Sequence, residues 1–566
     1  MAAIRKASWI LVPLALALGL NALAFASQEP SSDYQQHRFD VRSFGATGDG
    51  STLDTQAIQR AIRAASRAGG GIVLFHPGTY LAGTFELLSN VTLDIEAGAV
   101  LKASANIADY RPIKDFGFGR NYGVDLTGEG FLMGLIVAKN VENIAIVGQG
   151  AIDGSSGDFF DFTKPHYTMD FDPKATRQGQ AFMDAVLNTT DGPVAEKTTG
   201  RPGTLLVIFN CKNLLLRDIT VRNAPNWTIH ISNAQSSVIE GIHILNDPRI
   251  PNNDGIDCFN CRNMQIADSD IRTGDDDFAI VGGEDITVSN CTLFSNSSAI
   301  RLENTRYSLF SNLVIHANRG LAIYERGAGV TSDIQFSNIV IETHLLTGHW
   351  WGKGEPIYLA AGTSGGKGGT IRDITFTNVG GEAENGTVLY GAPGATVENI
   401  AFHQIAFRFR VTRPEVNAVV GGNFDFRWTA ESVHDGVFQH DIPALYARYV
   451  HGLKLEGFQV SWADAMPAWY SSALELENIS NIQIDRFEGR QAGAFSSSPV
   501  IAAKHVSDIS ITNSRADHGA TTFFSASDVR GERLFTGNDL RDTRQAFDSA
   551  TSFVMGENIL PSPASQ

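Results

Sequence analysis

Two stretches of the chain, NLLLRDITVRN (residues 213–223) and SVIEGIHILND (residues 237–247), share one pattern of alternating apolar and polar residues. The pattern recurs in NMQIADSDIRT (263–273), DITVSNCTLFS (285–295), SLFSNLVIHAN (308–318) and DIQFSNIVIET (333–343). Equivalent positions in the six segments lie 23, 27, 22, 22 and 26 residues apart: Ile219, Ile242, Ser269, Cys291, Leu313 and Ile339. Alternation is typical of strands with one buried face, and a repeat of this length indicates a solenoid with one stacked core.

The same pattern begins earlier in the chain and returns later, for example in NIAIVGQGAIDG and DISITNSRAD. We therefore predict an all-β fold, a single-stranded right-handed parallel β-helix that occupies residues 38–540. Helical periodicity is clear only at residues 54–62, where Asp54 can act as the N-cap. We expect this short helix to cover the open N-terminal end of the solenoid, because an uncovered end promotes aggregation. Its predicted apolar face consists of Ala57, Ile58, Ala61 and Ile62.

The N-terminus has the features of a cleavable secretory signal peptide. Residues 1–26 carry Arg5 and Lys6, then a largely apolar run, then Ala24-Phe25-Ala26. We predict a signal peptide over residues 1–26 and a linker over residues 27–37. The expected location is therefore secreted or periplasmic.

Three further segments depart from the repeat. Residues 155–203 and 344–368 are long and irregular, and long insertions of this kind usually line one face of a solenoid and shape its groove. Residues 541–566 are predicted to be a C-terminal tail. The sequence thus predicts one catalytic β-helix domain with two insertions.

The composition excludes several classes of partner. Without the signal peptide, 42 Lys and Arg stand against 61 Asp and Glu, a net charge of −19, which argues against nucleic acid. No later stretch approaches the roughly 18–20 apolar residues of a membrane helix, so we expect no membrane contact. Four cysteines are too few for a disulfide scaffold, and they are predicted to be buried thiols or to form one disulfide.

Aspartates are concentrated in PNNDGIDCFNCRNMQIADSDIRTGDDDFAI, residues 251–280. Asp254 precedes Asp275 by 21 residues, which is about one coil of the predicted solenoid, so the two clusters should stack and face one groove. Asp275 and Asp276 are neighbours, and neighbours in a strand point to opposite faces. Both can reach the groove only if the chain bends there, and Gly274 is a candidate for that bend.

Several motifs in order now resemble the polygalacturonase-like glycoside hydrolases of family 28, over about Phe39 to Thr343. They are GDG followed by DTQAIQRAI, then GGGIVLFHPGTY, GQGAIDG, GRPGTLLVIFNCKNLLLRDITVRNAPNWTIHI, and NNDGID followed by TGDDD. The resemblance implies that Asp275 is the general acid and that Asp254 and Asp276 position and deprotonate water. Crowded carboxylates raise one another's proton affinity, which would keep the acid protonated near neutral pH.

The chain departs from this family in two motifs. Where polygalacturonases carry Gly-His-Gly, this chain reads Ser297-Ser298-Ala299, and where they carry Arg-Ile-Lys it has Ala322 and Tyr324. The groups that would bind a galacturonate carboxylate are therefore absent from these positions. We expect a neutral or differently decorated sugar, not plain homogalacturonan, although Arg301, Arg319 or Arg326 could restore the missing charge.

Other residues are candidates for substrate binding. Strand parity places Arg301, Glu303 and Tyr324 on the groove face, although Arg301 and Glu303 could equally be a solvated pair. Trp350 and Trp351 could stack on sugar rings, or one of them could anchor the loop. The remaining candidates are Asn252, Asp257, His349, Lys353 and Glu355, of which Asp257 could instead support a turn.

The leading interpretation is an exported inverting glycoside hydrolase that acts on pectin-type plant or algal cell-wall oligo- or polysaccharide. We expect a monomer that needs no cofactor and no metal. One alternative is a uronan lyase that uses Ca²⁺ held by the aspartates, with an arginine such as Arg301 as base. A second alternative is a carbohydrate-binding β-helix without catalysis, which the loss of the family's histidine would permit.

Overall fold

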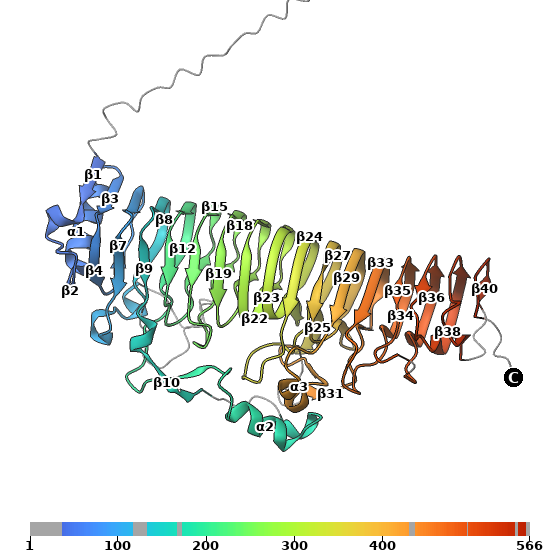
Figure 1. The fold of residues 1–566 in the computed structure, drawn as a ribbon. Coiled ribbons are helices and arrows are strands. Elements are labelled where there is room, and N and C mark those ends of the chain that lie inside the picture. The colour runs from blue at the N-terminus through green and yellow to red at the C-terminus, as the bar shows by residue number, and fades with distance from the viewer. Residues whose placement is uncertain are drawn as a thin grey trace, which may run out of the picture.

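The computed structural model describes residues 37–116, 133–166, 172–429, 436–494, 496–548 and 553–561. These residues form a right-handed parallel β-helix, as predicted, with β1 and β40 at opposite ends of a long stack (Figure 1). A typical coil contains three short strands, such as β14 (Ile229–Ser232), β15 (Gln235–Glu240) and β16 (His243–Leu245). Each strand pairs in parallel with its counterparts in neighbouring coils, and among the described residues 36 strands form one continuous sheet that wraps around the coils. Its three sides are called the first, second and third sheets below.

The first sheet carries the candidate site. It runs through β12 (Leu206–Arg217), β14, β17 (Ile256–Phe259), β20 (Phe278–Val281), β22 (Thr292–Glu303), β23 (Arg306–Arg326), β25 (Ile357–Ser364), β28 (Thr387–Gly391), β32 (Leu445–Arg448), β34 (Leu474–Asp485), β36 (Ile501–Thr512) and β38 (Thr522–Thr536). The longer strands bend from one sheet into the next.

The other two sheets complete the coils. The second runs through β12, β15, β18 (Arg262–Ala267), β21 (Glu284–Ser289), β23, β24 (Val330–Thr343), β27 (Thr370–Ala383), β29 (Thr396–Phe409) and β33 (His451–Trp462). The third begins with β9 (Ala151–Asp153), β13 (Thr220–Arg222), β16 and β19 (Asp270–Thr273) and continues through β22, β23 and β24. The first coils contain β1 (Arg38–Asp40), β2 (Asp49–Leu53), β3 (Gly71–Phe75), β4 (Gly78–Ala82), β5 (Phe85–Glu86), β6 (Val91–Ile95), β7 (Ala99–Ala103) and β8 (Ile136–Val147).

The strand register confirms the repeat read from the sequence. Thr220, His243, Asp270, Thr292, Val314 and Val340 pair one after another, and each follows directly on one of the six positions aligned above. Those six aligned residues are all buried. Behind them, four stacked rings at ring spacings of 5.0, 5.0 and 4.9 Å fill one side of the core: Phe310, Phe336, Phe376 and Phe402. Burial of one strand face thus sets the register of the whole stack.

The predicted capping helix is present as α1 (Thr55–Arg67), and its four predicted apolar residues are buried. Asp54 occupies the N-cap position, but its side chain does not bond the helix. Its carboxylate instead accepts hydrogen bonds from the Thr47 and Gly48 amides at 2.7 and 3.0 Å. Asp54 therefore holds the preceding loop against the helix, and it contributes to the cap in this indirect way.

Among the described residues, three long excursions beside the first sheet pack together on one side of the β-helix, and the sequence predicted two of them. Residues 155–203 contain β10 (Phe160–Pro165), α2 (Gln180–Leu187) and β11 (Val194–Glu196). The second excursion ends at residue 356, because residues 357–364 are strand β25 and belong to the stack, contrary to the predicted boundary of 368. The third excursion, residues 410–443, was not predicted and contains α3 (Pro414–Val420), β30 (Asn423–Asp425) and β31 (Val437–Gln439).

The three excursions pack against one another and form a layer beside the first sheet (Figure 1). One apolar cluster joins them: Phe182, Met183, Val186, Leu345, Val416, Val420 and Val437. Hydrogen bonds reinforce the contact, since Arg177 donates to Asn423 and to the Gly422 carbonyl. This layer reaches the part of the first sheet that carries the aspartates, since Arg201 donates to Asn252 and Trp428 lies 5.3 Å from Arg301.

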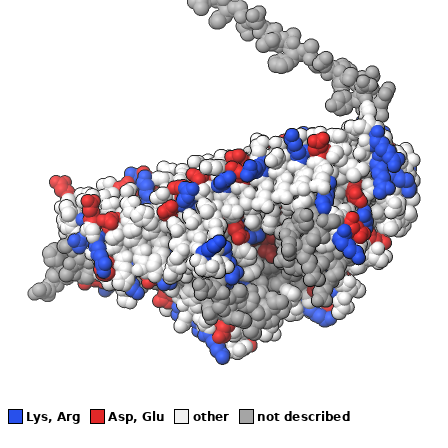
Figure 2. All heavy atoms as spheres, turned by 180° about the vertical axis from the view of Figure 1, so that it is seen from behind, with Lys and Arg blue, Asp and Glu red and all other residues white. Residues whose placement is uncertain are grey.

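The stack continues past residue 540, where the sequence predicted a tail. Strands β39 (Gln545–Phe547) and β40 (Val554–Met555) pair in parallel with β38. The predicted signal peptide and almost all of the linker lie outside the described residues. Among the described residues, no helix is both long and apolar enough to span a membrane. All four cysteines are buried free thiols. Basic and acidic side chains are interspersed along the face seen in Figure 2.

Candidate active site

Asp254, Asp275 and Asp276 come together on the first sheet, where two adjacent coils enter strands β17 and β20. One carboxylate oxygen from each residue lies within 4.8 Å of the other two. Their exposed fractions are only 5%, 8% and 5%. The expectation that the clusters stack in one place is therefore met.

The predicted bend between Asp275 and Asp276 is present, because residues 274–277 lie between strands β19 and β20 and outside either strand. Gly274 has an ordinary backbone conformation, so its role is not a positive φ. A Cβ atom at this position would lie 2.6 Å from the carbonyl oxygens of Pro248 and Ile250, too close for any side chain. The Gly274 amide also donates to Asn253 Oδ1 at 2.6 Å. Close approach of two chain segments therefore requires glycine here.

Arg301 lies beside the aspartates on the next coil. Its position on β22 pairs with Ala279, which in turn pairs with Asp257. Arg301 Nε donates to Asp276 Oδ2 at 2.6 Å, and its Nη1 lies 3.6 Å from Glu303 Oε2. Strand parity therefore placed Arg301 and Glu303 on the correct face, and the structure adds that Arg301 forms an ion pair with Asp276.

The crowded carboxyl groups have perturbed proton affinities. Burial raises the pKa of Asp275 to about 7, and the charge of Asp276 adds to this shift, while the Arg301 guanidinium opposes it. Burial also raises the pKa of Asp254 well above its usual range, with contributions from Asp257, Asp275 and Asp276. At neutral pH the cluster therefore retains protons, as a general acid requires.

Asp257 and Asn252 flank this cluster. Asp257 is fully buried, neither of its carboxylate oxygens has a hydrogen-bond partner, and burial raises its pKa well above the usual range. Asn252 accepts a hydrogen bond at 3.2 Å from Arg201 Nη2. Arg201 in turn forms an ion pair with Glu196 at 3.1 Å, so the first excursion supplies a cation to the edge of the site.

Tyr324 was expected to lie open to the groove, and the structure corrects this. The residue has the predicted parity, but only 2% of it is exposed because the third excursion covers it. Its ring lies 5.9 Å from the Trp428 ring, and its hydroxyl accepts a hydrogen bond from Arg319. Arg319 is itself buried and bonds both oxygens of Glu355 at 3.1 Å.

Four predicted sugar contacts in the second excursion differ in exposure. Glu355 and Lys353 are buried, and burial lowers the pKa of Lys353 to about 8, so both belong to the supporting structure. Trp350 is also buried, and its Nε1 donates to the Asp191 carbonyl at 2.7 Å, which makes it the loop anchor. Trp351 remains half-buried and is the tryptophan of this pair that can meet a ligand.

Residues 425–428 of the third excursion were missed by sequence reasoning. Trp428 is half-buried, meets Trp351 edge-to-face at 6.2 Å, and lies under the Arg301 guanidinium at 5.3 Å. Arg427 bonds both oxygens of Asp425, and its Nη1 lies 3.1 Å from Nε2 of the half-buried His349. The only signal in the sequence was an aromatic and charged run, NFDFRW, at residues 423–428.

The same three aspartates could also hold a metal ion. Among the described residues, they are the group of His, Cys, Asp or Glu side chains whose ligand atoms lie close enough together. Oxygen ligands of this type suit Ca²⁺, which takes six to eight of them. Asp276 is already engaged by Arg301, so a cation here would have to share that carboxylate.

This chain is similar in sequence to known enzymes. A probable polygalacturonase from Vitis vinifera is 31% identical over 256 residues, which is 44% of this chain and 45% of that protein. An exo-poly-alpha-D-galacturonosidase from Dickeya chrysanthemi is 26% identical over 416 residues, 70% of this chain and 65% of that protein. The matches thus span less than two thirds of the length of either relative.

A solved family 28 exopolygalacturonase from Yersinia enterocolitica shares the fold, with a TM-score of 0.55 and 19% identity over 79% of this chain and 78% of that chain. A family model described as rhamnogalacturonase A/epimerase, pectate lyase-like matches residues 38–172. The model of glycosyl hydrolases family 28 matches residues 125–415, which is more than half of the chain. This protein therefore belongs to glycosyl hydrolase family 28.

Proposed function

We propose that the protein is an exported inverting glycoside hydrolase that cleaves pectin-type oligo- or polysaccharide and acts poorly on plain homogalacturonan. The observation that carries the proposal is the cluster of Asp254, Asp275 and Asp276, with oxygens within 4.8 Å and an arginine bonded to one of them. Membership of family 28 supports the same reaction class. The secretory pattern of residues 1–26 supports export, and we propose a monomer that requires no cofactor.

Asp275 is the proposed proton donor. Its pKa of about 7 leaves it protonated in weakly acidic and neutral solution, so it can protonate the leaving oxygen of the glycosidic bond. Asp276 is held in its ion pair with Arg301 and accepts a hydrogen bond from water. Asp254 helps to position that water, and Asp276, paired with the Arg301 cation, receives its proton as the water attacks the sugar.

The separation of the carboxylates bears on the stereochemistry. Inverting enzymes commonly hold acid and base roughly 6.5–9.5 Å apart, and retaining enzymes about 5–5.5 Å apart. Here the candidate oxygens are within 4.8 Å. Two hydrogen bonds of about 2.8 Å span at most about 5.6 Å. One water bound by two carboxylates fits this spacing, but the spacing lies below the inverting range, so the proposed inversion rests on the resemblance to family 28 and not on this distance.

The cations around the cluster support a substrate without a carboxylate at the cleavage position. Arg301 pairs with Asp276, Arg319 with Glu355, Arg427 with Asp425, and Arg201 with Glu196. A galacturonate carboxylate would have to compete with an internal carboxylate for each of them. Arg319, which could have restored the charge missing at Tyr324, is fully buried in its own ion pair.

Two half-buried rings provide a surface for the sugar. Trp351 and Trp428 lie edge-to-face, with the Arg427 guanidinium 4.4 Å from the Trp351 ring and the Arg301 guanidinium 5.3 Å from the Trp428 ring. The ring faces that these guanidinium groups leave open can pack against sugar rings. The layer of three excursions reaches this part of the sheet, which supports attack at a chain end over attack within a long chain.

Activity on polygalacturonate and on neutral and branched pectic oligosaccharides, measured as new reducing ends, tests the proposal. We expect hydrolysis of the neutral or branched set, loss of activity in Asp275→Asn, and, by NMR, a first product of inverted anomeric configuration. Efficient turnover of polygalacturonate would refute the substrate choice. Retained activity in a folded Asp275→Asn variant would refute the catalytic assignment.

The second candidate is a Ca²⁺-dependent uronan lyase, which the metal-compatible spacing of the three aspartates favours. A lyase forms an unsaturated product that absorbs ultraviolet light, whereas hydrolysis forms none. Activity that disappears with EDTA and returns with Ca²⁺, together with that absorbance, would replace hydrolase by lyase.

A further inference from the structure

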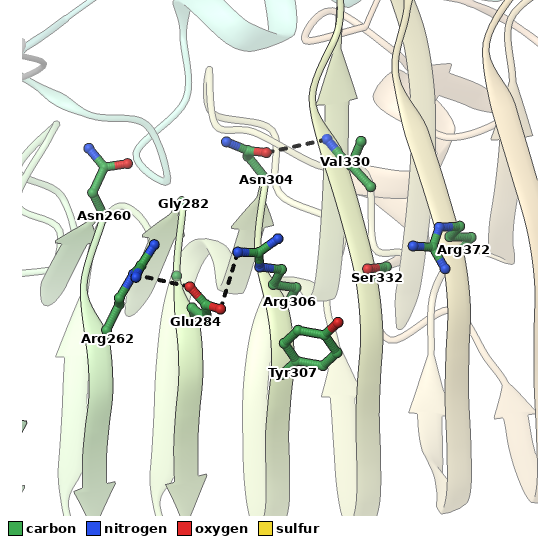
Figure 3. A pocket seen from close by; sticks show the side chains of 11 residues that line it. Asn260, Arg262, Gly282, Glu284, Asn304, Arg306, Tyr307, Val330, Ser332 and Arg372 are labelled. Atoms are coloured by element: carbon green, nitrogen blue, oxygen red, sulfur yellow. Dashed lines mark hydrogen bonds and ion pairs between the residues drawn. The ribbon is translucent and has the colours of Figure 1, made fainter.

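A groove of about 490 Å³ lies at the start of the strands of the second sheet, and Figure 3 shows the side chains that line it. It crosses the coils where β18, β21, β23, β24 and β27 begin. Asp254 precedes strand β17 and Asn260, which lines the groove, follows it. Six residues of extended chain separate the two positions by roughly 20 Å. The groove is therefore a separate site and not an extension of the catalytic one.

The floor of the groove is a single column of side chains. Arg262, Glu284, Arg306, Ser332 and Arg372 occupy the same register position in five successive coils. Neighbouring strands are about 4.8 Å apart, so alternate arginines are roughly 10 Å apart, comparable to the length of a disaccharide unit. The column presents hydrogen-bond donors and acceptors at a regular spacing along the long axis of the molecule.

Tyr307 is the residue in this groove that does not fit its structural position. It has a φ of 50°, a left-handed conformation that a bulky side chain rarely adopts. At the equivalent position other coils carry glycine or small polar residues, all with positive φ: Asn213, Ser236, Asn263, Asp285, Asp333, Asp373, Asn399 and Gly452. Asparagine and aspartate adopt this backbone conformation readily, whereas for tyrosine it is energetically unfavourable.

Burial does not compensate for that cost, since 56% of Tyr307 is exposed. Its ring lies in the groove beside Arg306 and Ser332, with the Arg306 guanidinium 5.8 Å from the ring centre (Figure 3). A strained and exposed aromatic residue is more readily explained by ligand binding than by packing, because strain of this kind collects at functional sites. A flat ring flanked by hydrogen-bonding groups suits the face of a sugar.

The charges in the groove indicate which saccharides it would accept. Glu284 bonds Arg262 at 3.0 Å and Arg306 at 3.1 Å, and Asp373 bonds Arg372. Each arginine thus already has a carboxylate partner, and its remaining N–H groups can donate to neutral acceptors. Sugar hydroxyls donate and accept hydrogen bonds, so they match this mixture of groups, whereas a polyuronate would meet the carboxylates of Glu284 and Asp373.

We propose that this groove is a second, non-catalytic site that binds an uncharged saccharide chain along the β-helix, with one sugar ring on Tyr307 and hydroxyls on the arginine column. Such a site would hold the protein on a polymer while the aspartates act elsewhere. The inference does not depend on which bond the aspartates cleave, or on whether they cleave one.

The test is affinity electrophoresis in native gels that contain galactan, arabinan or xylan, with polygalacturonate as the acidic comparison. All proteins carry Asp275→Asn, so turnover does not alter the gel and failure of the catalytic proposal does not affect the result. Tyr307→Asn restores the residue type of the other coils. It should weaken retardation by a neutral glycan by about tenfold. Its thermal transition should stay the same or rise.

Tyr449→Asn is the matched control, because Tyr449 also has a left-handed φ, 53°, and lies outside the groove. It should keep the parent affinity. Equal affinity of the Tyr307→Asn variant and its parent would overturn the proposal, as would retardation by polygalacturonate alone or by no glycan at all. In the otherwise unmodified enzyme, Tyr307→Asn should reduce turnover of polymer and leave turnover of a short oligosaccharide unchanged.

Discussion

Replacing Arg301 with methionine should move the upper pH limit of activity to higher pH. The proposed mechanism requires protonated Asp275, so activity falls as the pH rises through the Asp275 pKa of about 7. The Arg301 guanidinium lowers that pKa. Without the guanidinium, the carboxyl cluster holds its protons more tightly and the acid stays protonated to a higher pH.

The size of the shift follows from the geometry. Arg301 Nε is 2.6 Å from Asp276 Oδ2, and the candidate oxygens of Asp276 and Asp275 are within 4.8 Å. The guanidinium is thus at most about 7 Å from Asp275, where two unit charges at an effective dielectric constant of about 20 interact by at least about 2 kcal/mol. This energy corresponds to a shift of one to two pH units.

The assay is kcat/KM as a function of pH on the best oligosaccharide of the panel. Arg301→Lys keeps the charge and should shift the limit much less, although it loses the planar donor geometry. Arg306→Gln, which removes an exposed arginine of the distant groove, should leave the profile unchanged. Circular dichroism must confirm folding, because removing one partner of a buried ion pair costs about 3–5 kcal/mol.

An upper limit that stays in place, or moves to lower pH, in a folded Arg301→Met variant would refute the reasoning. It would mean that Asp275 is not the titrating acid, or that Arg301 does not control its protonation. A shift of equal size in Arg301→Lys would point to geometry instead of charge as the cause.

Three further predictions concern stability and binding. Asp275→Asn should abolish turnover, and it should raise the thermal transition temperature at pH 8 but not at pH 4. The reason is that folding raises the pKa of the Asp275 carboxyl from 3.8 to about 7. Such a group reduces the free energy of unfolding as the pH rises from 3.8 to 7, by up to about 4 kcal/mol, and asparagine removes this loss. Equal transitions of the variant and wild type at pH 8 would contradict this. Gly274→Ala should lower the free energy of unfolding by about 1–3 kcal/mol in chemical denaturation, because its Cβ meets two carbonyl oxygens. Gly157→Ala, with open space around it, should have a much smaller effect. Trp428→Ala should raise KM about tenfold in steady-state kinetics, and an unchanged KM would remove this ring from the sugar site.

The sequence by itself determined the β-helix, its register and the meeting of the aspartates. The alternation of apolar and polar residues can be read within a single strand. If a strand shifted by one residue relative to its neighbours, all its apolar side chains would point outward. Burial of Ile219, Ile242 and their equivalents therefore allows only one strand register. Given that register, residues one coil apart are neighbours. Asp254 and Asp275, 21 residues apart, were therefore predictable as a pair.

The tertiary structure alone decided what covers the site. The third excursion carries no periodic pattern, and its partners are remote in the sequence, as when Arg177 donates to Asn423 across 246 residues. Strand parity placed Tyr324 on the groove face correctly, but it could not show that Trp428 buries that residue. It was also unable to distinguish Trp350, the anchor, from Trp351.

The same distinction applies to the groove at Tyr307. The column from Arg262 to Arg372 is implicit in the repeat, yet the backbone angle of Tyr307 is visible only in three dimensions. Repetition in a solenoid specifies contacts between adjacent coils because each coil presents the same face to the next. Contacts made by the irregular segments depend on long-range packing and on charge pairing, which no local pattern in this sequence encodes.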